Sequence, residues 1–188
     1  MLRTAVELFN EQGYEGTSME DLARALGVTK SAIYHHVPGK EALLGQSLDR
    51  ALDALFAVLE DSAGTTGSAM ERLEYVLLRS VRVLDAELPH VTLLLRVRGN
   101  TEVERRALRR RREFDHRITE LVRAGMDSGE VRCDLDPAVA SRLLFGMVNS
   151  TVEWYRPGQG LGAEDLARTI AAVAFDGLRS HGGGQPDR

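Results

Sequence analysis

Residues 17–44 read TSMEDLARALGVTKSAIYHHVPGKEALL. The stretch predicts two short helices joined by a tight turn at Gly27, followed by a third helix that starts after Pro38-Gly39. A helix-turn-helix needs a small residue in its first helix, a glycine in the turn and a β-branched residue in its second helix. Ala23, Gly27 and Ile33 occupy these places. The same spacing also occurs in generic helical hairpins, so by itself it leaves both interpretations open.

The lysines of the chain are confined to this stretch. Lys30 and Lys40 are the only two, and every other one of the 24 basic residues is an arginine. Basic side chains that neutralise DNA phosphates supply most of the non-specific affinity of DNA-binding proteins. Both lysines stand where a helix-turn-helix meets DNA, so the stretch predicts a DNA-binding protein.

Two segments carry a family resemblance. Residues 29–44 closely resemble the recognition helix and the start of the next helix in TetR/AcrR-type regulators, and residues 5–28, AVELFNEQGYEGTSMEDLARALGV, resemble the two preceding helices. The resemblance covers about residues 2–48 and is loose over the C-terminal two-thirds. It implies an all-α homodimer, in which each subunit has an N-terminal three-helix helix-turn-helix head and a C-terminal helical body for ligand binding and dimerisation.

The resemblance also implies a set of DNA-contacting residues. The first turn of the recognition helix would face base edges in the major groove, and residues at the end of that helix would reach backbone phosphates. The start of the preceding helix would bind another phosphate, helped by the helix dipole. In chain order these residues are Thr17, Ser18, Thr29, Lys30, Ser31, Ala32, Tyr34 and His35. Lys40 stands where the family places a phosphate-binding lysine.

These assignments have structural alternatives. Thr17 and Thr29 are suitable helix N-caps, and Thr17 with Glu20 is expected to form a capping box. Tyr34 is also suited to filling the core of the head. For Lys40, the alternative is a solvated lysine without a phosphate contact. The absence of lysine elsewhere favours a phosphate contact for Lys40.

Two features depart from the family pattern. Family members usually carry a basic arm before the first helix, whereas this sequence starts almost inside that helix and has only Arg3 there. The arm is therefore expected to be missing or to lie outside the sequence. The helix at Lys40 follows Pro38-Gly39 instead of a Ser, Asn or Asp cap, and glycine is the weaker cap by roughly a few tenths of a kcal/mol. Neither feature changes the prediction of DNA binding.

The composition is that of an ordinary globular protein, and it indicates a compartment. Cys133 is the single cysteine, which favours a reducing, cytoplasmic setting. No apolar run approaches the roughly 18 residues that a membrane span needs, and the first residues do not form a signal peptide. We expect no membrane partner, cofactor or metal site.

The charge of the chain argues for weak non-specific DNA binding. The formal net charge is −4, and residues 1–45 carry four basic side chains against six acidic ones. Affinity for phosphate depends on the local field, which decays over about 8 Å at physiological salt. Useful binding is therefore expected to need two heads on one DNA site.

Helical periodicity continues through nearly the whole chain, without a convincing alternating strand. The first three helices are expected to end at Gly13, at Gly27 and at about His36. Further helices are expected at 40–61, 69–87, 90–98, 101–128, 137–155 and 164–179, with a flexible connector at 62–68. The predicted organisation is a DNA-binding domain at 1–46, a ligand-binding and dimerisation domain at 47–180, and a disordered tail at 181–188.

The expected helix at 101–128 has an apolar stripe that is interrupted by arginine. Arg110 or Arg111 fills the missing turn, and an inward-facing arginine needs a partner because an unpaired buried charge is costly. A ligand carboxylate or phosphate is one possible partner, and the run is also typical of a solvated face. The alternative partners within the chain are Glu102, Glu104 and Asp115.

Residues 145–158, FGMVNSTVEWYRPG, loosely resemble the matching helix of acyl-CoA-sensing branches of the family. An apolar tunnel with arginines would suit an acyl chain that carries a phosphorylated headgroup. The expected effector is an acyl-CoA thioester or another amphipathic metabolite. The candidate pocket residues are Arg96, Arg110, Arg111, Phe114, Phe145 and Asn149; Asn149 is equally suited to facing a partner subunit. By resemblance, the helices at 137–155 and 164–179 form the dimer interface.

No residue pattern typical of catalysis is present. His35 and His36 are adjacent, not four residues apart as two metal ligands on one helical face would be. The sequence therefore predicts a ligand-responsive transcriptional regulator, namely a repressor that a small molecule releases from a palindromic operator. The alternative is a helical protein-interaction or ligand-binding bundle without operator binding.

Overall fold

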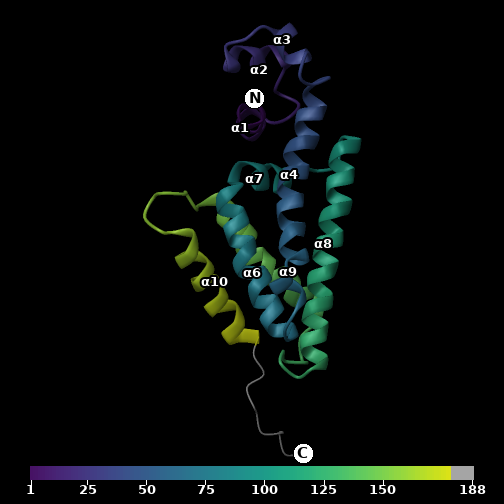
Figure 1. Cartoon of the computed structure of the whole chain (residues 1–188), viewed down its shortest axis with the longest axis vertical. Coiled ribbons are helices and arrows are strands. Elements are labelled where there is room, and N and C mark those ends of the chain that lie inside the picture. The colour runs from purple at the N-terminus through teal and green to yellow at the C-terminus, as the bar shows by residue number, and fades with distance from the viewer. Residues whose placement is uncertain (179–188) are drawn as a thin grey trace, which may run out of the picture. The chain divides into compact units, whose positions relative to one another are not determined.

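The computed structural model describes residues 1–178, and every regular element in this range is a helix (Figure 1). This confirms the predicted all-α fold. None of the helices in this range combines the length and the apolar character that crossing a bilayer requires. The predicted disordered tail at 181–188 lies outside the described residues. The helices are α1 (Leu2–Gln12), α2 (Met19–Leu26), α3 (Lys30–Tyr34), α4 (Lys40–Glu60), α5 (Ser62–Thr65), α6 (Ala69–Ala86), α7 (Leu88–Arg96), α8 (Glu102–Asp127), α9 (Pro137–Ser150), the 3-10 turn η1 (Thr151–Glu153) and α10 (Ala163–Leu178).

The chain forms two compact units. Unit 1 combines residues 1–54 with residues 86–111, and unit 2 combines residues 55–85 with the chain from residue 112 onward. The long helices α4 and α8 contribute residues to both units. This grouping is not the linear division at residue 46 that the sequence predicts, and that domain boundary stays a prediction.

The first two helices, both in unit 1, follow from short apolar stripes that end at glycines. α1 ends before Gly13, whose φ of 80° favours glycine. α2 ends at Gly27, which takes the left-handed conformation with φ 65° and ψ 29°, as the sequence predicts. Leu22 of α2 is 0% exposed and Ile33 of α3 is 1% exposed. These two side chains anchor the turn between α2 and α3.

The N-cap of α2 lies one residue later than predicted. Ser18 caps the helix, because its hydroxyl accepts a hydrogen bond from the Asp21 backbone N–H, while the Ser18 N–H donates to the Asp21 carboxylate. The predicted capping box of Thr17 and Glu20 is therefore wrong. Thr17 is 1% exposed, and its hydroxyl donates to the Gly13 carbonyl oxygen at 2.8 Å, so it joins the end of α1 to the next loop.

Several helix ends also differ from the prediction. The expected flexible connector contains the one-turn helix α5, which Asp61 caps by accepting a hydrogen bond from the Ala63 N–H at 3.3 Å. α3 ends at Tyr34, before the expected His36. α7 includes Pro89 in its first turn, where a missing N–H costs no helical hydrogen bond. The expected single helix at 137–155 is divided into α9 and η1.

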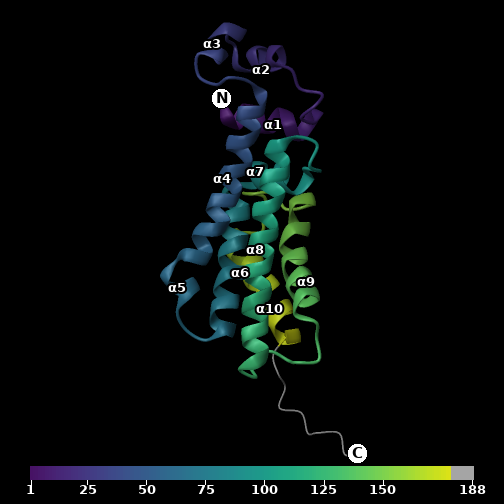
Figure 2. The same ribbon diagram turned by 90° about the vertical axis from the view of Figure 1, so that its right-hand side faces the viewer.

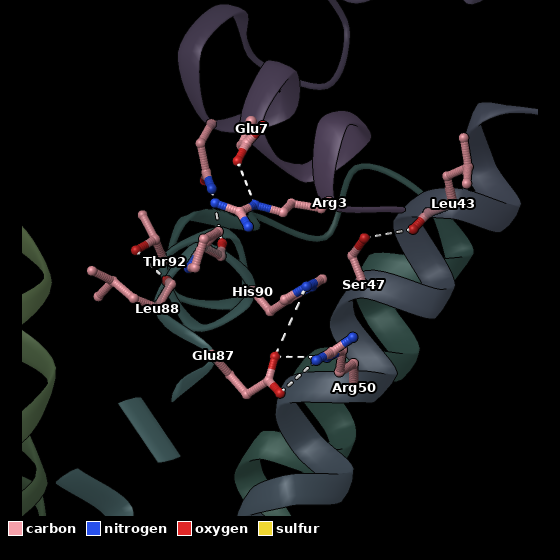
Figure 3. A network of polar contacts seen from close by, with 11 residues as sticks. Arg3, Glu7, Leu43, Ser47, Arg50, Glu87, Leu88, His90 and Thr92 are labelled. Carbon is pink, nitrogen blue, oxygen red and sulfur yellow. Dashed lines mark hydrogen bonds and ion pairs between the residues drawn. The ribbon is translucent and has the colours of Figure 1, made fainter. Parts of the chain in front are cut away.

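In unit 1, polar contacts attach α7 to both α1 and α4. Arg50 of α4 donates from Nε and Nη2 to the two carboxylate oxygens of Glu87, the N-cap of α7, at 2.6 and 2.8 Å (Figure 3). Asn10 of α1 donates to the Pro89 carbonyl oxygen at 2.8 Å, and Arg96 donates to the Asn10 carbonyl oxygen at 3.0 Å. The bidentate arginine contact fixes orientation as well as distance, so α7 is held on two sides.

Unit 2 has an aromatic cluster in its core. The rings of Phe56, Phe114 and Phe145 pack edge to face, with centroid separations of 5.9 Å from Phe56 to Phe114 and 5.4 Å from Phe114 to Phe145. Edge-to-face packing is the favoured geometry for such rings. Phe114 and Phe145 thereby join α8 to α9, which run side by side in Figure 2. Beyond η1, the Tyr155 hydroxyl donates to the Asp85 carboxylate at 2.6 Å.

His90 is a buried histidine beside the Arg50–Glu87 ion pair (Figure 3). Its side chain is 7% exposed, and its Nε2 lies 3.9 Å from the Glu87 carboxylate. Its Nδ1 has no hydrogen-bond partner among the described residues. Burial lowers the pKa of His90, although the Glu87 carboxylate acts in the opposite direction.

The lowered pKa predicts an acid-sensitive fold. Below the ordinary histidine pKa of about 6.5, the unfolded chain binds a proton more readily than folded His90 does. The free energy of unfolding should therefore fall as the pH drops from about 6.5 through the folded-state pKa, by at most about 1.4 kcal/mol per pH unit. Urea unfolding between pH 7.5 and 5 should show that His90→Gln reduces this fall and that His116→Gln, at an exposed histidine of α8, does not. Equal pH dependence in both variants would contradict the prediction.

Candidate nucleic-acid interface

The start of α3 is the exposed part of the predicted DNA-reading motif. Thr29 caps the helix by accepting a hydrogen bond from the Ala32 N–H at 3.2 Å. Lys30 and Ser31 are exposed, and Ala32 is half-buried. Ile33 points into the core, at 1% exposure. The first turn of α3 is thus exposed to solvent, while buried Ile33 fixes the helix to the core of the head.

Two aromatic residues follow on α3 and just after it. Tyr34 is 47% exposed, so the alternative that it fills the core of the head is wrong. His35, the C-cap of α3, is exposed as well. Both side chains are available at the surface for the phosphate contacts that the sequence predicts, which stay predictions.

Lys30 has an acidic partner in the preceding helix. Its ammonium forms an ion pair with the Glu20 carboxylate of α2. This hydrogen bond raises the pKa of Lys30 and lowers the pKa of Glu20. The sequence gives no signal for this pair, because the two residues are ten positions apart and meet only through the turn between the helices.

Thr17 and Ser18 are already hydrogen-bonded. The Thr17 side chain is buried and bound to the Gly13 carbonyl oxygen. The Ser18 hydroxyl donates to the Asp21 carboxylate at 2.6 Å. A phosphate contact through either hydroxyl would require exchange of these partners, and both roles stay predictions.

Lys40 connects the start of α4 to the loop between α1 and α2. Its Nζ donates to the carbonyl oxygens of Tyr14 and Thr17, at 2.9 and 3.0 Å, and lies 4.4 Å from the centre of the Tyr14 ring. It is therefore not the freely solvated lysine of the alternative interpretation. An ammonium group has three N–H donors, so these two hydrogen bonds leave one donor for a phosphate.

The predicted effector residues fall into separate groups. In unit 1, Arg110 donates to Asp49 and Asp53 of α4, at 2.9 and 2.6 Å. The sequence suggests the neighbouring acids Glu102, Glu104 and Asp115 as partners. These two hydrogen bonds instead go to carboxylates of α4 that are 61 and 57 positions away in the sequence. Arg96 instead donates to the Asn10 carbonyl oxygen, and Arg111 is half-buried.

Unit 2 holds the other predicted effector residues. Phe114 and Phe145 are buried and pack against each other, and Asn149 on α9 is half-buried. The ligand role of these residues stays a prediction.

An apolar groove of about 380 Å³ runs along α9 and α10 in unit 2. Ala140 and Leu144 of α9 face the core, whereas Val139 is 51% exposed and Leu143 is 66% exposed. Val173 of α10 is also 66% exposed. The residues lining the groove include Leu135, Val139, Leu143, Met147, Val173 and Ala174. α9 therefore has one face in the subunit core and one apolar face in solvent.

Comparisons with known proteins match both parts of the sequence. Residues 1–46 match the family model for bacterial regulatory proteins of the tetR family. Residues 66–178 match the model for the tetracyclin repressor-like C-terminal domain. The second match alone covers more than half of the chain.

Solved structures of regulators are similar over nearly the full length. A TetR-family member from Streptomyces coelicolor A3 is 54% identical, with a TM-score of 0.89, and the match covers 95% of this chain and 90% of that one. AibR, solved in complex with isovaleryl coenzyme A and operator DNA, is 25% identical with a TM-score of 0.80, over 93% of this chain and 95% of AibR.

A named repressor is also a relative. The HTH-type transcriptional repressor KstR2 of Mycobacterium tuberculosis is 26% identical, over 97% of this chain and 92% of KstR2. The structure of that ketosteroid transcriptional regulator has a TM-score of 0.88. The recognition helix is exposed and two family models match along the sequence, so the protein belongs to the TetR family of bacterial regulators, which are DNA-binding transcription factors and not enzymes.

Proposed function

We propose that the protein is a homodimeric repressor that binds a palindromic operator and leaves it when a small molecule binds the C-terminal part of the chain. The exposed first turn of α3, fixed by buried Ile33, is the observation that carries the DNA-binding role. In a helix-turn-helix, this turn contacts base edges, and the two heads of a dimer bind half-sites about 34–36 Å apart. The relative KstR2 is itself named a repressor.

The proposed effector is an acyl-CoA thioester. The support is the similarity to AibR, whose structure contains isovaleryl coenzyme A, together with the apolar, aromatic core of unit 2 around Phe114 and Phe145. Arg96 and Arg110 have protein partners, so binding of a phosphorylated headgroup by either would require partner exchange. The effector acts only through the difference between its affinities for the DNA-binding and the released conformations.

The first experiment identifies the operator and then tests release. Immobilised protein should retain genomic fragments that share an inverted repeat, and a gel shift should confirm binding to that repeat over shuffled DNA. Acyl-CoA thioesters of short and long chain length should then release the complex, while free coenzyme A, which has the same headgroup, should not. Retention of no common sequence would favour the bundle without operator binding. Binding that every thioester leaves unchanged would reject the effector class alone.

Lys40 is proposed to have both a structural role and a phosphate contact. Lys40→Met removes two hydrogen bonds from a charged donor, so the free energy of unfolding should decrease by about 1–3 kcal/mol. Loss of the phosphate contact should also reduce the slope of log affinity against log salt by about one. Urea unfolding and salt titrations of operator binding separate the two effects. An unchanged salt slope in the folded variant would leave Lys40 with the structural role only.

The groove on α9 and α10 is proposed as the dimer interface. Its exposed apolar side chains, Leu143 and Val173, would be buried against the same surface of a second copy, as in a two-fold symmetric interface.

A charge placed in this groove should prevent dimer formation. Leu143→Glu buries an unpaired carboxylate twice in a symmetric dimer, so self-association should weaken at least about tenfold, which corresponds to about 1.4 kcal/mol. Sedimentation equilibrium measures this, with Leu161→Glu, a leucine that is 39% exposed outside the groove, as the matched control. If Leu143→Glu remained as dimeric as the control, the interface would lie elsewhere.

A further inference from the structure

Every permanently charged basic side chain in residues 1–46 has a partner within the head. Arg3 pairs with Glu7 and Arg24 pairs with Asp21, each at 3.0 Å. Lys30 pairs with Glu20, and Lys40 donates to two carbonyl oxygens. Three of the four cations of the free head are therefore paired with a carboxylate, and Lys40, which binds neutral carbonyl oxygens, keeps one N–H donor free.

The Lys30–Glu20 pair differs from the two arginine pairs. The arginine pairs each join residues one turn apart on a single helix. Lys30 and Glu20 instead connect α3 to α2, and their side chains are 46% and 57% exposed. Lys30 is also the first residue of α3. The Glu20 carboxylate therefore lies at the edge of the surface proposed to read bases.

We propose that Glu20 is a specificity-determining residue, which withholds Lys30 from the phosphates of non-specific DNA and releases it to the operator. This inference rests on the proposed operator binding. In non-specific DNA, the group that competes with Glu20 for Lys30 is the phosphate diester.

The strengths of the competing interactions support this role. An exposed ion pair contributes little to stability because solvent screens it, so a better partner displaces it. Non-specific complexes are held by phosphate contacts. In such a complex, a lysine that is neutralised by Glu20 contributes little.

The operator offers Lys30 a different partner. Guanine O6 and N7 accept hydrogen bonds from lysine in the major groove, and such contacts discriminate strongly between bases. This gain exceeds the worth of the exposed ion pair with Glu20. Glu20 therefore weakens non-specific binding more than operator binding, and it raises the ratio between the two affinities.

The test compares Glu20→Gln with Glu11→Gln in the full-length protein. Both changes remove one negative charge from the head, but the Glu11 carboxylate is exposed on α1 and forms no hydrogen bond or ion pair with other described residues. Binding to the selected operator and to shuffled DNA is measured by fluorescence anisotropy over a range of salt concentrations. Thermal unfolding checks that both variants keep their fold.

A freed Lys30 should add one phosphate contact to the non-specific complex of Glu20→Gln. The slope of log affinity against log salt for shuffled DNA should steepen by at most about 0.9, and the affinity at roughly 0.1 M salt should rise by at most about fivefold, because the gain cannot exceed the stability of the exposed ion pair that is lost. Operator affinity should rise less, so the ratio of the two affinities should fall. In a Lys30→Gln background, Glu20→Gln should lose the slope change, because coupling between paired residues disappears when one of them is absent.

The outcomes separate this inference from the proposed function. A wild-type protein that selects no DNA sequence would overturn the proposed operator binding, and this inference with it. Intact operator preference, combined with equal effects of Glu20→Gln and Glu11→Gln, would overturn the role of Glu20 alone. A slope change that persists without Lys30 would show that the carboxylate acts by direct repulsion and not through the ion pair, and it would also overturn the proposal.

Discussion

The size of its interior constrains the DNA-binding head. A segment as short as residues 1–46 buries too little apolar surface to hold three short helices firmly by itself, and α3 has only five residues. The structure meets this constraint by including residues 86–111 in the same compact unit. Asn10 and Arg50 bind α7, and buried side chains such as Leu93 and Leu94 enlarge the interior. The positions of α2 and α3 depend on this shared packing.

Polar contacts hold the loop between α1 and α2 in place. Lys40 satisfies two carbonyl oxygens of the loop after α1, and Thr17 satisfies another at the end of that helix. Unpaired backbone carbonyls in a partly buried loop would be costly. Residues that the family resemblance associates with phosphate contacts therefore also stabilise the head in the absence of DNA, so their substitution affects folding as well as binding.

The cations of the head already have partners within the protein. Its few cations are paired with neighbouring acids or carbonyl groups, which fits the net negative charge of the chain. Weak attraction to DNA in general makes recognition depend on groups at defined positions and, in the proposed dimer, on the separation of two heads. Protein carboxylates also bind Arg110 through Asp49 and Asp53, so an inward arginine is not by itself a sign of an anionic effector.

The sequence by itself determined the all-α fold, the helix-turn-helix and most helix positions, because Gly13, Gly27 and the apolar stripes act over a few residues. It also placed the start of the recognition helix at the Thr29 cap, although the helix ends at Tyr34 and not at about His36, and the cap of the preceding helix lies one residue away from its predicted position. Tertiary structure alone decided the partners of Lys30, Lys40 and Arg110, since these contacts join residues that are ten or more positions apart. Local spacing carries no information about which distant acid or carbonyl group the fold brings within reach. The partners that the fold provides for the lysines of the head set the charge that the head presents to DNA.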